Sequence, residues 1–294
     1  RTVINRLNGE WRTGIQIGQE PRVFTEFYQP ISYSLRNFVH MGASIGERAV
    51  NVFDDDGKKL SELNLRSYCV ELGAGRELGT WGEIRAGLFR ESGKIEIQVG
   101  DPSTLDYDFD NGELFLQLYI DELDNINFPR VGGFLRLRAT VGLKELGSGE
   151  DYEQGILEGS YAYTVGRYTG HLSGMFKMTR DSDAPVQSMY SLGGFKRLSG
   201  LEQNELMGQQ AALLAGAFYR KFGDYMLLPI YAGFTVEYGN VFQERDAIRL
   251  EEGIFAGSVF LGVDTIIGPI YIAYGITDTN RQNYYLSLGR KFNK

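Results

Sequence analysis

The segment ELFLQLYID, residues 113–121, decides the fold class of this 294-residue chain. Its aliphatic side chains are Leu114, Leu116, Leu118 and Ile120, one at every second position. Successive side chains of a β-strand point to opposite faces, so this period of two predicts a strand with one apolar face. The positions between them carry polar or aromatic side chains, which indicates a second face of different character.

The same alternation extends over almost the whole chain, and no long amphipathic helix is predicted. Further strands are predicted at residues 11–18, 22–29, 35–53, 60–72, 81–100, 135–141, 152–165, 167–180, 209–221, 227–241, 253–266, 269–276 and 284–292. The acidic segments 54–57 and 101–111 are predicted to be loops. Short and longer connections alternate along the chain, and the total is about fifteen strands.

The composition and the strand lengths favour a membrane barrel over a soluble sheet. The chain has 38 Gly, 18 Tyr and 18 Phe against 7 Pro, a mixture that suits strands and tight corners. Strands of ten residues or more exceed the usual length, and a soluble sheet built from them would expose long edges. Alternating short and long connections are typical of outer-membrane barrels. A soluble all-β protein is the alternative.

We therefore predict an all-β fold, an antiparallel transmembrane β-barrel of about 16 strands, as one domain over residues 1–294. Such barrels have even strand numbers, so the first strand is expected upstream of residue 1. The predicted location is the bacterial outer membrane, with the lipid bilayer as a partner. No cofactor or metal is expected.

Other classes of protein are disfavoured by charge and cysteine content. The net charge of −8 argues against a general nucleic-acid binder, which normally has a basic face. The single cysteine, Cys69, excludes an intrachain disulfide and is predicted to be a small side chain facing lipid or core. No apolar run reaches the roughly 18 residues that a membrane-spanning helix needs.

Two short motifs resemble catalytic or metal sites. Residues 42–46, GASIG, fit the G-x-S-x-G nucleophile pattern around Ser44, with His40 nearby. That motif requires a strand, a turn and a helix, whereas this segment continues as a strand, so we expect a barrel without catalytic activity. The acidic segments 54–57 and 106–110 offer oxygen ligands for a divalent cation, but they lack EF-hand spacing and are interpreted as solvated loop tips. Arg136, Arg138 and Arg167 are expected to line the barrel interior or to meet loop carboxylates, and not to hold a specific ligand.

A long connection between two predicted strands, about residues 181–208, stands out because inserted loops of this length are usually functional. Its glycines Gly193, Gly194 and Gly200 indicate tight turns and close approach to another surface. We predict an ordered loop that folds against the sheet.

Three segments carry a resemblance to a known family. The glycine pair Gly193-Gly194 precedes the tetrad LSGL, residues 198–201. The segment FTVEYGNVF, residues 234–242, is a strand with an acidic residue and a glycine at fixed positions. The segment DNINFPRVG, residues 124–132, has the form of a turn with Asp, Pro and Gly. Together they resemble the BamA/TamA-type surface-antigen superfamily of outer-membrane barrels.

The resemblance implies a set of contacts in the barrel interior. The family's loop motif corresponds here to Gly193, Gly194, Lys196, Arg197, Leu198, Ser199, Gly200 and Leu201. It is expected to dock on the barrel wall near Phe218, Phe234, Glu237 and Gly239. The family's arginine is replaced by Ser199 and its wall glutamate by Phe218. Lys196 or Arg197 is therefore expected to supply a cation to Glu237.

The RLSG version of the loop, with residues 77–89 and 22–30, looks most like the translocator barrels of patatin-like autotransporters, class d of type V secretion. This implies a translocator that anchors and exports an N-terminal passenger, a patatin-like phospholipase, with a POTRA domain in the same chain. The alternatives are an assembly and insertion factor for other outer-membrane proteins and a passive channel. The oligomeric state is left open between a monomer and a homo-oligomer.

The last predicted strand carries Tyr284, Leu286, Leu288 and Phe292 on one face. The resemblance implies that this pattern is a signal read by the barrel-assembly machinery. The same pattern is also that of an ordinary last amphipathic strand.

Overall fold

The computed structural model describes residues 2–18, 20–53, 59–99, 106–180, 182–225, 228–244 and 249–289. The predictions for residues 54–57 and for Phe292 lie outside these ranges. The described part is almost wholly strand, with short 3-10 helices η1 (Lys144–Leu146), η2 (Val186–Ser188) and η4 (Leu250–Glu252). Within that part, no helix has the length and apolar character to cross a membrane.

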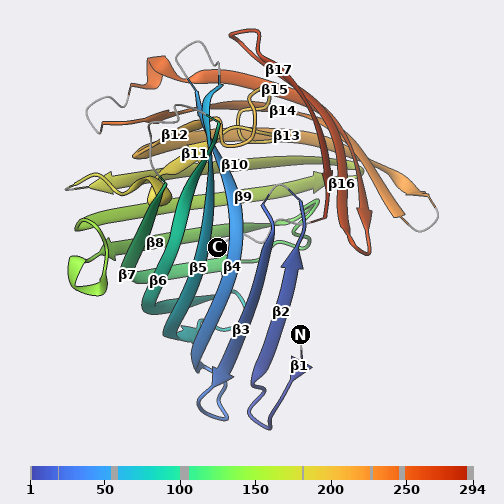
Figure 1. Ribbon diagram of the computed structural model, residues 1–294. Coiled ribbons are helices and arrows are strands. Elements are labelled where there is room, and N and C mark those ends of the chain that lie inside the picture. The colour runs from blue at the N-terminus through green and yellow to red at the C-terminus, as the bar shows by residue number, and fades with distance from the viewer. Residues whose placement is uncertain are drawn as a thin grey trace. The chain divides into compact units, whose positions relative to one another are not determined.

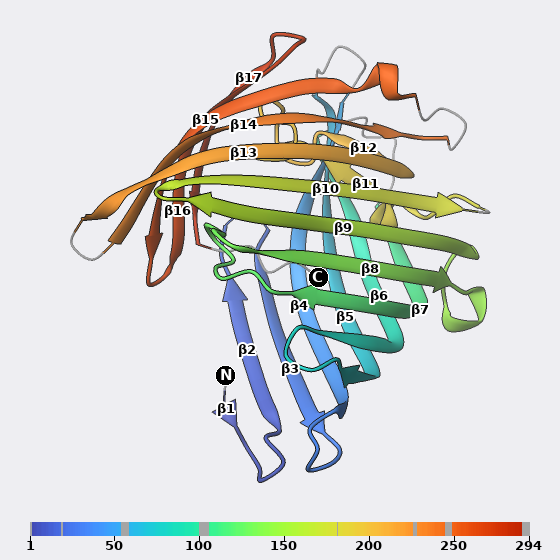
Figure 2. The same cartoon turned by 180° about the vertical axis from the view of Figure 1, so that it is seen from behind.

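Consecutive strands lie side by side in one sheet, in the order β1 to β10 followed by β13 to β17 (Figures 1 and 2). Strands β11 and β12 form a separate two-stranded ribbon. The strands are β1 (Thr2–Val3), β2 (Glu10–Gln16), β3 (Arg22–Pro30), β4 (Asn37–Phe53), β5 (Lys59–Glu77), β6 (Gly82–Val99), β7 (Tyr107–Asp121), β8 (Gly132–Gly142), β9 (Tyr152–Val165), β10 (Tyr168–Arg180), β11 (Tyr190–Leu192), β12 (Leu206–Gly208), β13 (Gln210–Tyr225), β14 (Leu228–Phe242), β15 (Ile254–Thr265), β16 (Gly268–Thr277) and β17 (Gln282–Leu288). The predicted all-β antiparallel fold is confirmed.

The acidic segment before residue 113 is one place where the predicted boundaries were wrong. Strand β7 begins at Tyr107, six residues before the predicted start, and pairs with β6 from Tyr107↔Ile95 onward. Acidic side chains at this end have basic partners on β6: Asp106, just before β7, pairs with Lys94 at 3.1 Å, and Asp110 of β7 pairs with Arg90 at 3.3 Å. Each of the two carboxylates pairs with a different basic side chain, so they are not held together as ligands of one metal ion. No group of metal-ligating side chains is found in the described part of the chain.

The chain divides into two compact units, and the division passes through β8, β9 and β10. The first unit comprises residues 1–120, 136–155 and 179–189, and the second comprises residues 121–135, 156–178 and 190–294.

In the first unit, alternate residues build a small apolar cluster of Leu65, Ile95 and Phe109. Beside it lies a buried polar network, in which the Tyr152 hydroxyl and the Asn111 amide each donate to Glu113 Oε1 at 2.7 Å. Burial of a carboxylate is tolerated when donors satisfy it, as here.

Cys69, Ser44 and His40 also lie in the first unit. Cys69 is buried, and its thiol donates to the buried carboxylate of Glu91 at 3.4 Å. Of the two predicted environments, lipid and core, its side chain therefore faces the core. Ser44 accepts from Arg22, whereas His40 pairs with Glu71 at 2.9 Å. Both lie on β4, where four residues of strand separate them by about 13 Å. This geometry excludes a Ser–His catalytic pair.

In the second unit, strands β13 to β17 have two distinct faces. One face, here called the inner face, carries buried side chains such as Tyr219, Glu237 and Tyr271. The opposite outer face is apolar and exposed, and its large side chains include Leu214, Phe218, Phe234, Val236, Val259, Leu261, Ile272, Tyr284 and Leu286. This alternation makes every second residue of each strand part of the inner face.

The connection from β7 to β8 folds as a tight turn. The Asp124 carboxylate accepts from the backbone of Arg130 at 2.7 Å and of Val131 at 3.0 Å. Gly132 follows with φ +103°, and a Cβ there would meet Glu122 O at 1.9 Å. The spacing of Asp, Pro and Gly therefore has a structural reason: the aspartate closes the turn and only glycine fits at its end.

Candidate functional site

The candidate site is the connection between β10 and β13, whose residues 190–208 belong to the second unit. Strands β11 and β12 pair from Tyr190↔Gly208 to Leu192↔Leu206 and form the base of the loop. Leu192, Leu198 and Leu201 are buried with Ala211 and Ala256 of the inner face. The loop is thus anchored by its own apolar core against β13 and β15.

The loop tip, residues 193–200, has an unusual backbone. Gly193, Gly194, Lys196, Leu198 and Gly200 all have positive φ. Gly193 N donates to Arg197 O at 2.8 Å, and a Cβ on Gly193 would lie 2.3 Å from Glu202 O. Left-handed Lys and Leu residues are strained by about 1–2 kcal/mol each. Contacts with the sheet must hold this tip in place.

Glu237 on β14 provides the central contact with the tip. Its carboxylate is fully buried and accepts from Ser199 N at 2.6 Å, Ser199 Oγ at 2.7 Å and Thr235 Oγ1 at 2.5 Å. Ser199 Oγ in turn accepts from Lys196 N at 3.0 Å. Hydrogen bonds to a charged group are stronger than neutral ones, so three donors offset much of the cost of burying this carboxylate.

The backbone of the tip lies directly on β16. A Cβ on Gly275 would be 2.7 Å from both Gly200 N and Ser199 Cβ, so only glycine permits this approach. Gly200 has φ +113°, and its own Cβ would be 2.8 Å from Thr277 N. Two glycines, one on the loop and one on the strand, therefore allow backbone-to-backbone contact.

Strand β17 completes the attachment through one tyrosine. The Tyr285 hydroxyl accepts from Gly200 N at 2.8 Å and donates to Leu201 O at 2.7 Å. Arg281, just before β17, forms an ion pair with Glu205 of the loop. Burial raises the pKa of Glu205, and the positive charge of Arg281 opposes that effect.

Lys196 inserts its ammonium group among aromatic rings. Its Nζ lies 4.4 Å from the ring centroid of Tyr271 and 5.2 Å from those of Phe195 and Phe260. Cations are attracted to aromatic faces at such distances. Burial lowers the pKa of Lys196 to about 8, although the negative charge of Glu237 opposes the shift.

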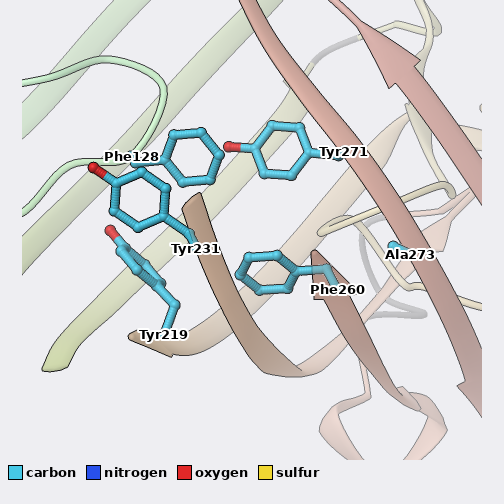
Figure 3. Packing of buried hydrophobic residues seen from close by; sticks show 6 residues of the cluster. All are labelled: Phe128, Tyr219, Tyr231, Phe260, Tyr271 and Ala273. Carbon is cyan, nitrogen blue, oxygen red and sulfur yellow. The ribbon is translucent and has the colours of Figure 1, made fainter. Parts of the chain in front are cut away.

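The same rings continue into an aromatic cluster that holds the β7–β8 turn. Phe128 of that turn is buried and stacks on Tyr231, with 4.1 Å between centroids and 8° between planes, and packs beside Tyr271 (Figure 3). The Tyr271 hydroxyl donates to Asn127 O at 2.6 Å and accepts from Lys196 Nζ at 3.4 Å. One tyrosine therefore contacts both the loop tip and the turn.

Asp264 of β15 holds the other side of that turn. Its carboxylate accepts from the side-chain amides of Asn127 at 2.7 Å and Asn125 at 3.0 Å. The Tyr219 hydroxyl donates to Pro129 O. The turn is thus fixed on the inner face by one carboxylate and two tyrosines.

A comparison with protein-family models matches residues 9–292 to the Omp85 superfamily domain. The chain belongs to the Omp85 superfamily. It is an integral β-barrel protein of the bacterial outer membrane, in a family of translocator and assembly barrels, as the resemblance to surface-antigen barrels implied. Among curated protein sequences, none matches the chain.

Solved structures support the same fold. BamA from Haemophilus ducreyi lacking POTRA domains 1–3 aligns with a TM-score of 0.71 at 11% identity, over 91% of this chain and 61% of that one. CdiB from Escherichia coli aligns with a TM-score of 0.63 at 13% identity, over 91% of this chain and 52% of that one. CdiB from Acinetobacter baumannii aligns with a TM-score of 0.57 at 12% identity, over 90% of this chain and 48% of that one. The chain spans about half to three fifths of these proteins.

The structure places the expected wall partners of this Omp85 barrel on different faces. Glu237 contacts the loop, whereas Phe218 and Phe234 lie on the outer face, exposed and packed against each other at 5.8 Å. The assignment of Phe218 and Phe234 as partners of the loop was therefore wrong. Gly239 is on the inner face, and a Cβ there would be 2.4 Å from Ala212 O of β13.

The supply of a cation to Glu237 by Lys196 or Arg197 remains a prediction; the negative charge of Glu237 acts to raise the pKa of Lys196. Arg197 donates to the backbone of Ser191 at 2.7 Å. Arg138 lies half-buried on the first unit's sheet with its guanidinium 4.3 Å from the Phe115 ring centroid, and Arg167 is exposed in the β9–β10 turn.

Tyr284, Leu286 and Leu288 of β17 share one exposed face, opposite to Tyr285. Their recognition by the assembly machinery remains a prediction. Sequence reasoning missed Tyr271, Gly275, Tyr285 and Phe128 as contacts of the loop and the turn. The only available signal was alternation, which makes Tyr271, Gly275 and Tyr285 inner-face residues but does not specify what they touch.

Proposed function

We propose that this Omp85 barrel anchors and translocates an N-terminal passenger domain, in the manner of class d type V secretion, and that the passenger is a patatin-like phospholipase. The proposal includes a POTRA domain between passenger and barrel in the same polypeptide. It is supported by the RLSG loop, in which Ser199 rather than an arginine meets the buried Glu237.

The loop is the part of the barrel that performs the proposed role. Its tip lies on the inner face, where it occupies space that a passing polypeptide would need. Ser199 binds Glu237 through short hydrogen bonds without a formal countercharge of its own. Hydrogen bonds to a carboxylate are stronger than neutral ones, so they hold the tip on the wall, and a passenger segment has to replace them during export.

The direct test is export of the passenger by the intact polypeptide. Phospholipase activity and protease-accessible passenger would be measured on whole cells for the parent, for Glu237→Ala and for Ser287→Ala, an exposed control on β17. We expect Glu237→Ala to lower surface passenger, because an undocked loop no longer props the barrel wall that export requires, and Ser287→Ala to leave it unchanged. Normal export by Glu237→Ala, with the barrel correctly inserted, would refute the proposed role of the loop.

The second candidate function is assembly or insertion of other outer-membrane proteins, which the family membership favours. In that case, loss of the protein would lower the levels of unrelated barrel proteins in the outer membrane. An unchanged outer-membrane profile together with lost passenger would support translocation. A passive channel, the third candidate, predicts a stable open conductance in the parent protein.

A further inference from the structure

One charged side chain interrupts the outer face of β13–β17. Among the side chains of that face that the structure describes, Arg220 of β13 alone carries a charge. Its neighbours along the same face of the strand are Phe218 and Phe222, both exposed. A charge on the lipid-facing side of a barrel is costly near the membrane centre and is tolerated near the interface.

Arg220 lies at an end of the lipid-facing surface. It pairs directly with Tyr168, the first residue of β10, which follows the short turn at Gly166. Lys221 N donates to Arg167 O of that turn at 2.9 Å. Because short turns mark one membrane boundary of such barrels, Arg220 is level with that boundary.

The side chain is held in a defined position by two aromatic rings. The guanidinium carbon lies 5.4 Å from the ring centroid of Tyr168 and 5.0 Å from that of Phe222. Tyr168 is itself stacked on Phe218 at 5.8 Å. The Arg220 Nε atom is buried and has no hydrogen-bond partner among the described residues. The guanidinium is therefore preorganised, and within the described ranges no carboxylate forms an ion pair with it.

Aromatic side chains extend this region along the same boundary. Tyr163 of β9 is exposed two residues before the end of its strand at the same turn, and the exposed Tyr161 lies two residues further along the strand from that end. Tyrosine at this level is typical of the aromatic belt that contacts lipid headgroups. Arg167 in the turn is exposed and adds positive charge at this edge.

We propose that Arg220 binds the phosphate group of a phospholipid in the leaflet at the short-turn end of the barrel. The planar guanidinium matches the oxygens of a phosphodiester, which it can bind through two parallel hydrogen bonds. Tyr168 and Phe222 pack against the glycerol and the first acyl carbons. This site depends on the membrane location of the barrel and is independent of passenger export.

The test is lipid retention by the intact polypeptide, extracted in detergent and observed by native mass spectrometry with added phosphatidylglycerol. Replacing Arg220 by glutamine should weaken binding of the tightest lipid about tenfold, since a charge-assisted contact is lost. Arg220→Lys, which keeps the charge but not the planar fork, should give an intermediate value. Arg249→Gln, an exposed control near η4, should bind lipid like the parent.

Equal lipid retention by the parent and Arg220→Gln would overturn the proposal. Displacement of the lipid by inorganic phosphate at the same phosphate concentration would also overturn it, because it would mark a site for the free ion. If Arg220→Gln does not form a heat-resistant barrel, the double variant Tyr168→Leu, Phe222→Leu replaces it. That variant keeps an apolar surface, and undiminished retention by it would count against the site.

Discussion

Ser199 donates two hydrogen bonds to the carboxylate of Glu237, one from its backbone N–H at 2.6 Å and one from its hydroxyl at 2.7 Å. The two residues are 38 positions apart, one on the loop tip and one on β14, and both are fully buried. This pair joins the loop to the inner face and determines what the first variants should do.

Glu237→Gln should loosen the loop more than Ser199→Ala. Glutamine has one acceptor oxygen, so at least one of the three donors around it loses its partner, at a cost of about 2 kcal/mol. Ser199→Ala keeps the backbone bond and should cost about 1 kcal/mol. Tryptic cleavage after Lys196 and Arg197 measures the undocked fraction. A double variant whose loss equals the sum of the single losses would show that the two residues act independently.

Gly275→Ala should displace the loop tip. The added methyl group would lie 2.7 Å from Gly200 N and from Ser199 Cβ, so the loop backbone has to move. Gly216→Ala on β13 is the matched control, because a Cβ there meets nothing within 4 Å. Faster tryptic cleavage of the loop is expected for Gly275→Ala only. Equal cleavage of the two variants would contradict the close contact between tip and β16.

Loop docking should strengthen as the pH rises from about 8 to 10.5. Burial lowers the pKa of Lys196 to about 8 from its usual 10.5, so the docked state binds this proton less tightly than the undocked state does. Docking is therefore penalised by the charge below pH 8, and the penalty, at most about 3 kcal/mol, is relieved as the pH approaches 10.5. The titratable groups that face the ammonium are Tyr271, Glu237 and His171.

The pH effect is measured as loop protection against a protease that is active over this range. Lys196→Met keeps the apolar stem and removes the titrating group, so its protection should be nearly constant between pH 8 and 10.5. A Lys196→Met variant with the same pH dependence as the parent would assign the effect to another group.

Phe128→Ala should destabilise the barrel by about 3–5 kcal/mol. The ring is buried at the centre of the aromatic cluster, and its removal leaves a cavity between Tyr231 and Tyr271. Phe255→Ala, on the exposed outer face, is the control and should have a smaller effect. Urea unfolding monitored by tyrosine fluorescence gives both values. Similar losses for the two variants would argue against an ordered turn on the inner face.

The strands were predictable because alternation is a local property. The period of two in residues 113–121 and its repeats predict nearly every strand of the sheet, and the errors fall at the ends, as at Tyr107. Ion pairs with Lys94 and Arg90 accompany the β6–β7 pairing there, and a scan for apolar alternation does not detect them.

Parts of the site were also predictable. The glycines of the loop and Glu237 follow from the motif. The prediction put Phe218 and Phe234 on the wrong face of the sheet. For Phe234 the alternation of residues 234–242 would have sufficed, because it puts Phe234 and Glu237 on opposite faces of β14. Tyr271 and Tyr285 reach the loop from strands about 75 to 85 positions away, so only the assembled sheet reveals those contacts.

The measurement that most directly tests the docked loop is single-channel conductance of the barrel with and without residues 193–206. If the tip occupies the barrel interior and props the wall, the parent should be largely closed, and the deletion variant should be leaky or unstable in a planar bilayer. The same conductance in both proteins, with passenger export unchanged, would contradict the role assigned to Ser199 and Glu237.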